Sequence, residues 1–307
     1  MPIKRTTAVY LASLLTLGSA HALAEAPPLA VSWIHGRADC SRGQESAYQA
    51  FKLNDDTYIL RQDKCLEYEA PFLYLLLGRQ RALLLDTGSV EIPTDTAETD
   101  AQLSPLRQVV DRIMDDYAAA QHIKDLPLLV AHSHGHGDHV AGDPLFHKRA
   151  RTHVVDPGVR SVLAFWGFSS MTGPGVVFDL GDRLLDVLPI PGHFVDHIAV
   201  YDRNHALLMS GDSLYPGRLY IDDWGAFRAS IGRLQRVIAV RPLDYILGGH
   251  IEMSRQAGVD YPVGSTYQPN EHVLELRASH LDELNQALKA IGPHPKRQTH
   301  ADFIIDP

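Results

Sequence analysis

The residues best suited to chemistry lie between positions 131 and 143, in the stretch AHSHGHGDHVAGD. Within it, His134, His136, Asp138 and His139 form the pattern His-x-His-x-Asp-His. Neutral imidazole and carboxylate are the ligand types that suit Zn²⁺ with open coordination positions, and a tight glycine-bearing loop can direct several of them to one point. The pattern therefore predicts a metal site. A polar surface loop, the alternative, would leave these side chains crowded without a reason.

Three segments further along the chain place a ligand-type side chain directly after a glycine that ends an apolar run. They are Pro191-Gly192-His193, Ser210-Gly211-Asp212 and Gly248-Gly249-His250. Any one of them alone is typical of a turn or a cap. Functional side chains concentrate on loops that a rigid scaffold positions. Together, the three segments predict that residues far apart in the sequence converge on the histidine cluster.

In this order the segments resemble the metallo-β-lactamase superfamily of metal-dependent hydrolases, from the strands before Asp86-Thr87-Gly88 to Gly249-His250. The resemblance implies an α/β fold, an αββα four-layer sandwich with the metal site at one edge of two central sheets. It also implies that Asp86 supports the site from behind the ligands. His132 and His197 match no ligand position, and we expect them to orient or pack against the ligands.

The same resemblance implies the roles of seven side chains. One metal ion would be held by His134, His136 and His193, a second by Asp138, His139 and His250, with Asp212 bridging the two. Such a set can hold two dications roughly 3.5–4 Å apart, and a water between them would ionise near neutral pH. Hydroxide is then the nucleophile, and polarisation of a carbonyl or phosphoryl oxygen is the second contribution. We expect two Zn²⁺ as cofactor, with Mn²⁺ or Fe²⁺ as alternatives, and catalytic roles for Asp138 and Asp212.

Two positions narrow the reaction. Di-iron redox members of the superfamily carry a glutamate where this chain has His136, although mononuclear iron dioxygenases keep the histidine. β-Lactamases generally have cysteine or serine where this chain has Asp212, whereas glyoxalase-II-like thioesterases, lactonases and phosphoesterases have aspartate. The expected function is hydrolysis of an ester, lactone, thioester or phosphoester. The alternatives are a β-lactam hydrolase, an iron dioxygenase, and a binding protein that has lost catalysis.

Tyr215 lies three residues after Asp212, a spacing that resembles that of acyl-homoserine lactonases. This resemblance implies a catalytic tyrosine that donates to the substrate oxygen; packing beside the loop is the alternative. Arg218 either replaces the lysine with which several β-lactamases hold a substrate carboxylate, or faces solvent. The segments 164–175 and 259–270 either line the pocket or pack the domain edge, through the aromatic and thioether side chains of Trp166, Phe168, Met171, Tyr261 and Tyr267.

The elements that must position these residues follow from periodicity. Strands are predicted within 47–62, 72–78, 82–86, 126–133, 152–155, 176–180, 183–190, 197–202, 206–212 and 243–249. Helices are predicted from Pro105, after Ser104 as N-cap, over 157–168, after Asp223 as N-cap, and over Asn270 to Ile291. Strands that alternate with helices in both halves of the chain suggest sheets covered by helices.

The N-terminus and the composition set the context. Lys4 and Arg5 precede an apolar run and small residues, which predicts a signal peptide over residues 1–24, a single hydrolase domain over 25–307, and a secreted or periplasmic protein. Removing residues 1–24 takes away two cations and no acid, so the formal charge changes from −9 to −11. We therefore expect a small-molecule substrate, no nucleic-acid partner and no stable membrane span. Cys40 and Cys65 form either one disulfide or two separate thiols.

Overall fold

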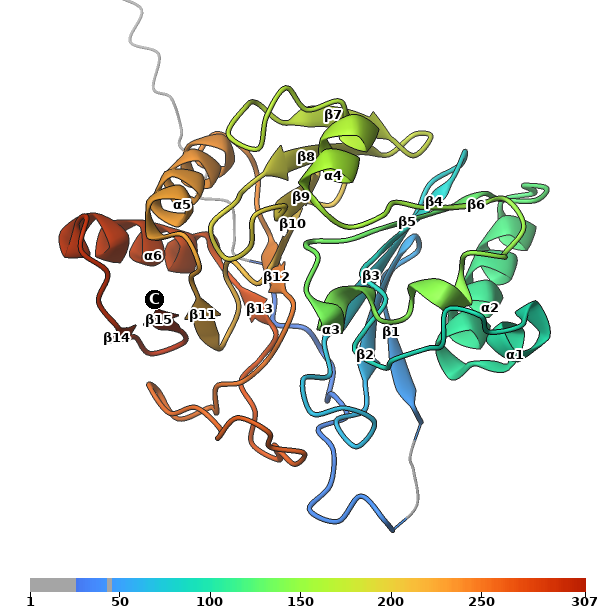
Figure 1. Ribbon diagram of the computed structural model, residues 1–307, viewed down its shortest axis with the longest axis horizontal. Coiled ribbons are helices and arrows are strands. Elements are labelled where there is room, and N and C mark those ends of the chain that lie inside the picture. The colour runs from blue at the N-terminus through green and yellow to red at the C-terminus, as the bar shows by residue number, and fades with distance from the viewer. Residues whose placement is uncertain (1–25, 43–45) are drawn as a thin grey trace, which may run out of the picture.

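The computed structural model describes residues 26–42 and 46–307, and the predicted signal peptide lies outside them. Two six-stranded sheets lie face to face and helices cover the outer side of each, so the layers run α, β, β, α (Figure 1). The predicted αββα sandwich is confirmed. Within the described residues, none of the helices has the length and apolar character needed to cross a membrane.

The first sheet has the order β1-β2-β3-β4-β5-β6. Neighbours are antiparallel from β1 to β4 and parallel from β4 to β6. Every residue of β3, β4 and β5 is buried, as in strands that are covered on both faces. The strands are β1 (Tyr48–Asn54), β2 (Thr57–Gln62), β3 (Phe72–Leu77), β4 (Ala82–Leu85), β5 (Leu128–Ala131) and β6 (Thr152–Val154).

The second sheet has the order β13-β12-β10-β9-β8-β7, and a small third sheet follows the order β11-β15-β14. In the second sheet, β10 and β12 are parallel, so a helical crossover must connect them. The strands are β7 (Val176–Asp179), β8 (Leu184–Pro189), β9 (Ile198–Asp202), β10 (Leu207–Gly211), β11 (Arg218–Tyr220), β12 (Tyr245–Gly248), β13 (Glu275–Leu276), β14 (Gln298–Thr299) and β15 (Ile304–Asp306).

Helices cover the two outer faces through their apolar sides. α2 begins at Pro105 as predicted, but the Ser104 side chain makes no capping hydrogen bond. The Asp223 side chain does cap its helix, because it accepts a hydrogen bond from the Ala226 amide. The helices are α1 (Glu98–Leu103) and α2 (Pro105–Ala120) on the first sheet, α5 (Trp224–Ile238) and α6 (Ala278–Ile291) on the second, and the shorter α3 (Gly137–Val140), η1 (Asp143–Leu145) and α4 (Val159–Trp166).

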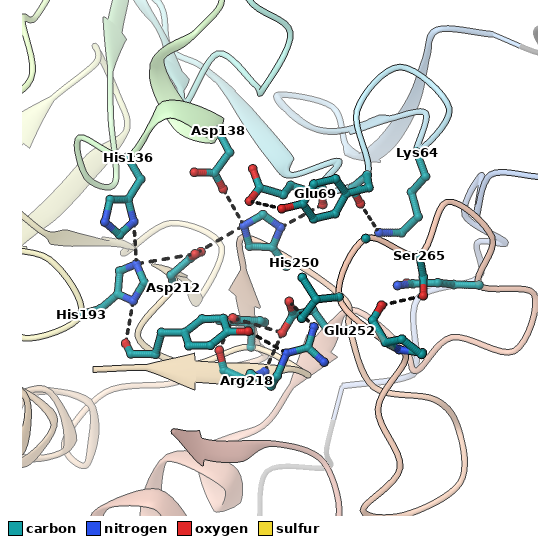
Figure 2. A pocket seen from close by; sticks show the side chains of 17 residues that line it. Lys64, Glu69, His136, Asp138, His193, Asp212, Arg218, His250, Glu252 and Ser265 are labelled. Atoms are coloured by element: carbon teal, nitrogen blue, oxygen red, sulfur yellow. Dashed lines mark hydrogen bonds and ion pairs between the residues drawn. The ribbon is translucent and has the colours of Figure 1, made fainter. Parts of the chain in front are cut away.

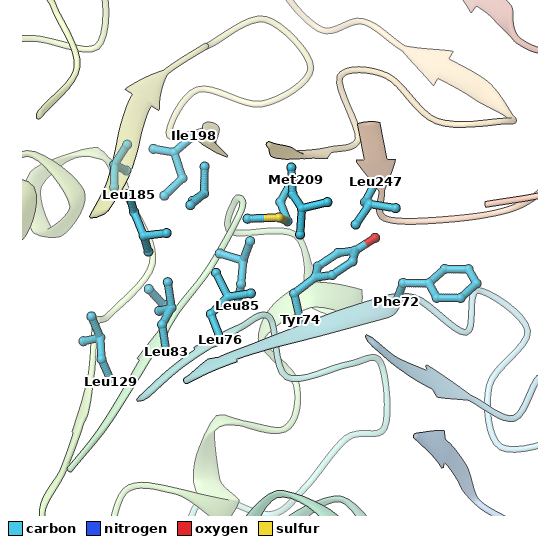
Figure 3. Packing of buried hydrophobic residues seen from close by; sticks show 14 of the residues in the cluster. Phe72, Tyr74, Leu76, Leu83, Leu85, Leu129, Leu185, Ile198, Met209 and Leu247 are labelled. Carbon is cyan, nitrogen blue, oxygen red and sulfur yellow. The ribbon is translucent and has the colours of Figure 1, made fainter. Parts of the chain in front are cut away.

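The main core lies between the two sheets. Figure 3 shows Leu76, Leu83 and Leu85 of the first sheet facing Ile198 and Met209 of the second. All five side chains are essentially excluded from solvent, and burying each of them stabilises the fold by roughly 1.5–3 kcal/mol. The apolar runs that predicted the strands therefore also hold the two halves of the molecule together.

One buried cation also joins the sheets. Arg183, which precedes β8, donates to the Asp202 carboxylate at 2.5 Å and to the Leu77 carbonyl of the first sheet at 3.2 Å. It donates further to the Asp56 carbonyl and the Thr57 hydroxyl at the turn between β1 and β2. A buried guanidinium is tolerable only where its donors are paired in this way. The arginine therefore fixes the register of one sheet against the other.

Two sequence expectations need correction. The helix predicted from Asn270 begins only at Ala278, because Glu275 and Leu276 form β13, whose backbone pairs with β12 in the buried second sheet. Of the two alternatives for the segment 164–175, packing is the one observed, although it is in the core and not at the domain edge. Its larger apolar side chains belong to the core cluster between the sheets: Trp166, Phe168 and Met171.

A disulfide joins the N-terminal segment 26–42 to the loop after β2. Cys40 and Cys65 are bonded, with their Cα atoms 5.3 Å apart, so of the two alternatives for these cysteines the disulfide is confirmed. It closes a loop of 25 residues, which contributes on the order of 3 kcal/mol in the chain-entropy account.

Candidate metal centre

Five strand ends supply the candidate site. Asp86 follows β4, the histidine-rich loop and α3 follow β5, and single residues follow β8, β10 and β12. The structure brings all seven predicted ligands together at this edge of the sandwich. They form two groups that could each hold a metal ion: His134, His136 and His193 in one, and Asp138, His139, Asp212 and His250 in the other.

In the first group three imidazole nitrogens point at one another. His134 Nε2 lies 3.0 Å from His136 Nδ1, and His193 Nε2 lies 3.1 Å from each of those two atoms. Ligands at 2.0–2.1 Å in a tetrahedron around zinc are separated by about 3.3 Å, so this spacing fits a shared ion. His134 and His136 come from the loop after β5, whereas His193 comes from the loop after β8.

The second group combines two imidazoles with two carboxylates. Asp138 Oδ2 lies 3.2 Å from His139 Nε2 and 3.1 Å from His250 Nε2. Asp212 places Oδ1 3.5 Å from His139 Nε2 and Oδ2 3.3 Å from His250 Nε2. His139 Nε2 and Asp212 Oδ1 are buried and have no hydrogen-bond partner among the described residues. Buried polar atoms are nearly always paired, so these two atoms fit the role of metal ligands.

Asp212 also adjoins the first group. Its Oδ2 atom lies 3.8 Å from His193 Nε2, so one carboxylate faces both sets of donors. Backbone geometry permits this approach. Gly211 has a φ of +49°, and a side chain at Gly249 would come within 2.2 Å of Asp212 Oδ1. The glycines before Asp212 and His250 are therefore needed for the close packing of the two loops.

Hydrogen bonds behind the ligands fix the direction of each ring. Asp86 Oδ2 accepts from His139 Nδ1 at 2.9 Å, and Asp86 Oδ1 accepts from the Ser133 amide at 2.6 Å. The Tyr220 carbonyl accepts from His193 Nδ1 at 2.7 Å. Because Nδ1 is the donor in His139 and His193, Nε2 of these two rings keeps a lone pair directed at the centre, and such partners govern metal affinity.

His132 and His197 belong to neither donor group. His132 Nε2 lies 2.8 Å from the Asp143 carboxylate, a pair that ties the histidine-rich loop to η1. His197 Nε2 accepts from the Asp212 amide, and its ring stacks on that of His134 at 4.8 Å. Both arrangements agree with the expectation that these residues orient or pack rather than ligate.

The two groups differ in electrostatics. Burial lowers the pKa of His134 well below its ordinary value and lowers that of His193, so both rings are neutral and offer lone pairs. At His250 burial acts in the same direction, but the carboxylates of Asp212 and Asp138 outweigh it and raise the pKa to about 10. A cation that binds the second group therefore has to displace protons from it.

A cavity of about 330 Å³ opens onto both groups, at the lower limit of small-molecule pockets. Figure 2 shows His136, Asp138, His193, Asp212 and His250 on one side of it. The second of the two predicted pocket segments, 259–270, does line the cavity, through Pro262, Val263, Gly264, Ser265 and Gln268.

Tyr215 and Arg218 lie in the cavity wall, and both are hydrogen-bonded to protein. The Tyr215 hydroxyl donates to the Arg218 carbonyl. To act as an oxyanion donor, it would have to release this carbonyl and donate to the substrate oxygen instead. Arg218 is buried rather than solvent-facing. Its guanidinium donates to Glu252 at 2.9 Å and Asp260 at 2.6 Å. It therefore braces the wall, and its charge is already neutralised.

The lining residues that were not identified from the sequence include the charged side chains of Lys64, Glu69 and Glu252. Each lies in a loop with no motif around it. The signal that was available for Lys64 is its position next to Cys65, because a disulfide fixes the backbone on which that lysine stands.

Comparisons with known proteins agree with this geometry. A family model described as the metallo-beta-lactamase superfamily matches residues 69–250. The acyl-coenzyme A thioesterase MBLAC2 of Gallus gallus is 27% identical over 202 residues, which are 59% of this chain and 72% of that protein. A hydroxyacylglutathione hydrolase of Rhizobium meliloti (strain 1021) is 27% identical over 154 residues, 49% of this chain and 57% of that protein.

Among solved structures, a metallo-beta-lactamase from Pontibacter korlensis superposes with a TM-score of 0.51 at 17% identity, covering 79% of this chain and 99% of that one. At this identity the likeness shows the fold alone.

Proposed function

Since the chain belongs to the metallo-beta-lactamase superfamily of hydrolases, we propose that it is an exported dinuclear-zinc hydrolase that cleaves thioesters or related carboxylic esters. The observation that carries the proposal is the pair of adjoining donor groups with Asp212 between them. Relatives described as an acyl-coenzyme A thioesterase and as a hydroxyacylglutathione hydrolase support a thioester over a phosphoester or a β-lactam.

The donor set suits two zinc ions. The first group offers three imidazole nitrogens, and the second offers two nitrogens and two carboxylates, which is a set typical of zinc rather than of magnesium or calcium. When bound, the ions would lower the pKa of a water molecule and polarise the substrate carbonyl.

The residues of the chain supply the rest of the chemistry. The buried second group and the cavity wall exclude bulk water, which strengthens every charge interaction inside. Asp138 lies beside the cavity with 13% of its side chain exposed, so its carboxylate can accept a hydrogen bond from the attacking water and orient it. Asp86 and the Tyr220 carbonyl keep His139 and His193 in position throughout.

A metal and substrate survey tests the proposal. Purified protein loaded with zinc is assayed against thioester, ester, lactone, phosphoester and β-lactam panels, together with His136→Ala and Asp212→Ala. His147→Ala is the matched control, because this exposed histidine lies near the cluster in sequence but in neither donor group. Loss of a metal contribution of several kcal/mol corresponds to about a thousandfold in kcat/KM.

We expect two zinc ions per chain, thioester turnover that a chelator abolishes, and a loss of about a thousandfold in both ligand variants but not in the control. Unchanged turnover in His136→Ala would contradict the proposal. So would a single iron with oxygen consumption, which would identify the dioxygenase alternative.

Export is a separate part of the proposal. It is supported by the N-terminal sequence pattern and by the disulfide, since disulfides persist mainly in oxidising compartments. Fractionation of cells that produce the full chain should place the mature protein outside the cytoplasm, shortened by about two dozen residues as signal peptides are. A full-length cytoplasmic protein would contradict it.

A further inference from the structure

The side of the cavity away from His136 and His193 carries a lysine that the mechanism does not use. Lys64 follows β2 and lines the cavity, although only 3% of the residue is exposed. Figure 2 places it near Ser265, on the far side of the view from those two histidines. A lysine is rarely buried without a charged partner, so its surroundings call for an explanation.

The ammonium group has unused donor capacity. Lys64 Nζ donates to the Tyr68 carbonyl at 2.8 Å, and among residues 26–42 and 46–307 this is its one hydrogen bond. An ammonium has three donors, so two remain for another molecule. Glu271 makes no hydrogen bond to Lys64: its Oε2 atom lies 3.3 Å from Arg61, and its Oε1 atom is buried without a hydrogen-bond partner among the described residues.

A second polar side chain of the same cavity has unused hydrogen-bonding capacity. Gln268 lines the cavity with 4% exposure, and neither the oxygen nor the nitrogen of its carboxamide makes a hydrogen bond to a described residue. The amide nitrogen is a donor, which is what a carboxylate needs. Buried polar groups are nearly always paired, so the spare donors of Lys64 and Gln268 fit a ligand that supplies acceptors. By contrast, the other cation of the cavity, Arg218, already donates to Glu252 and Asp260.

The backbone holds this corner rigidly. The disulfide ties Cys65 to Cys40, and the Gln268 amide donates to the His35 carbonyl at 2.9 Å. Gly36 lies between the two loops, where an added Cβ would come within 2.9 Å of the Lys64 Cβ. A fixed ammonium loses little conformational entropy when it binds, which favours recognition.

We propose that Lys64 is a specificity-determining residue that binds a carboxylate of the substrate, in a polar corner shared with Gln268 and separate from the metal ligands. The inference rests on the proposed hydrolase function. It names the substrate class as thioesters or esters that carry a second, anionic group away from the carbonyl that reacts.

The charges around Lys64 make the binding depend on pH. Burial and the Arg61 guanidinium lower the pKa of Lys64 to about 7, while Glu271, Glu252 and Glu67 oppose them. The amine is therefore charged below this value and neutral above it. An arginine at the same position would stay charged over the whole range.

The test compares thioesters of N-acetylcysteamine that differ in one terminal group. Succinyl, glutaryl and adipoyl thioesters are each compared with the terminal amide of the same length, and thioacetates of 3-mercaptopropionate and its amide place the charge on the leaving group instead. The enzymes are the zinc-loaded wild type, Lys64→Met, Lys64→Arg and, as a surface control, Lys124→Met, whose lysine is exposed and remote from the cavity. Glutarate and glutaramate binding is measured by titration calorimetry.

We expect the wild type to prefer the carboxylate over the amide by about ten- to hundredfold in kcat/KM, in at least one of the two series. The preference should decline as the pH rises through about 7, disappear in Lys64→Met, persist without the pH dependence in Lys64→Arg, and be unchanged in Lys124→Met. Tighter binding of glutarate than of glutaramate should follow the same order.

If Lys64 only stabilised the fold, Lys64→Met would lower the turnover of carboxylate and amide substrates equally, and the preference between them would not change. Equal preference in the wild type and Lys64→Met, with both substrates cleaved, overturns the inference and leaves the hydrolase proposal intact. If no thioester is cleaved, the hydrolase proposal fails, and the calorimetry alone decides whether the corner binds a carboxylate.

Discussion

The support that Asp86 gives to His139 can be tested by Asp86→Asn. The carboxylate accepts from His139 Nδ1 at 2.9 Å and from the Ser133 hydroxyl at 2.9 Å and amide at 2.6 Å. Asparagine keeps the size and tolerates the positive φ of 70° at this position. It offers only one acceptor atom, so the Ser133 amide and the His139 ring can no longer both be satisfied.

The expected effect is on metal binding rather than on folding. Loss of such a partner typically weakens metal affinity by about 10–100-fold, which corresponds to about 1.4–2.7 kcal/mol. The loss should fall on one of the two zinc ions, because His139 belongs to the second donor group alone. Competition titration against a chromogenic chelator resolves the two affinities.

Asp143→Asn is the matched control. Asp143 also pairs with a histidine of the same loop, at 2.8 Å from His132 Nε2, but that histidine belongs to neither donor group. The control should lose stability without losing zinc affinity. If Asp86→Asn bound both ions as tightly as the wild type, the reasoning that places His139 in the centre through Asp86 would be refuted.

Three further predictions concern other parts of the molecule. Arg183→Met leaves a buried carboxylate unpaired and should lower the free energy of unfolding by about 3–5 kcal/mol in urea titrations; a loss below about 1 kcal/mol would contradict the bridging role. Tyr215→Phe should lower kcat less than about tenfold, because its hydroxyl donates to a backbone carbonyl; a loss of about a thousandfold would instead support an oxyanion donor. Replacing Cys40 and Cys65 by serine should lower the unfolding free energy by on the order of 3 kcal/mol, measured against the oxidised wild type, and an unchanged value would contradict it.

The sequence was informative wherever local pattern decides structure. The apolar runs that end at Asp86, Asp212 and His250 are strands, and the side chains after them lie at one edge because those strands are neighbours or face each other across the core. The glycines before Asp212 and His250 indicated close backbone approach, and the structure shows it.

Features that depend on tertiary contacts were not predictable in this way. Leu276 falls inside the helix predicted over Asn270 to Ile291, yet it pairs with Ile246 of β12 in a short strand at the edge of the second sheet. Trp166 has the composition of a pocket residue but fills the space between the sheets. The partnerships of Arg218 and the burial of Lys64 arise from loops about 40 or about 200 residues away, which no window of sequence contains.

The contact between residues 35–37 and residues 266–268 has a consequence for how the chain folds during synthesis. The Thr266 hydroxyl donates to the Arg37 carbonyl, although the two residues are 229 positions apart in the sequence. This contact closes the corner of the cavity beside Lys64. During synthesis the corner stays open until nearly the whole chain has emerged, because contacts so distant in sequence form late. Deleting residues 26–37, or shortening the loop that carries Thr266, should therefore produce the same defect, a wider and less selective opening of the cavity.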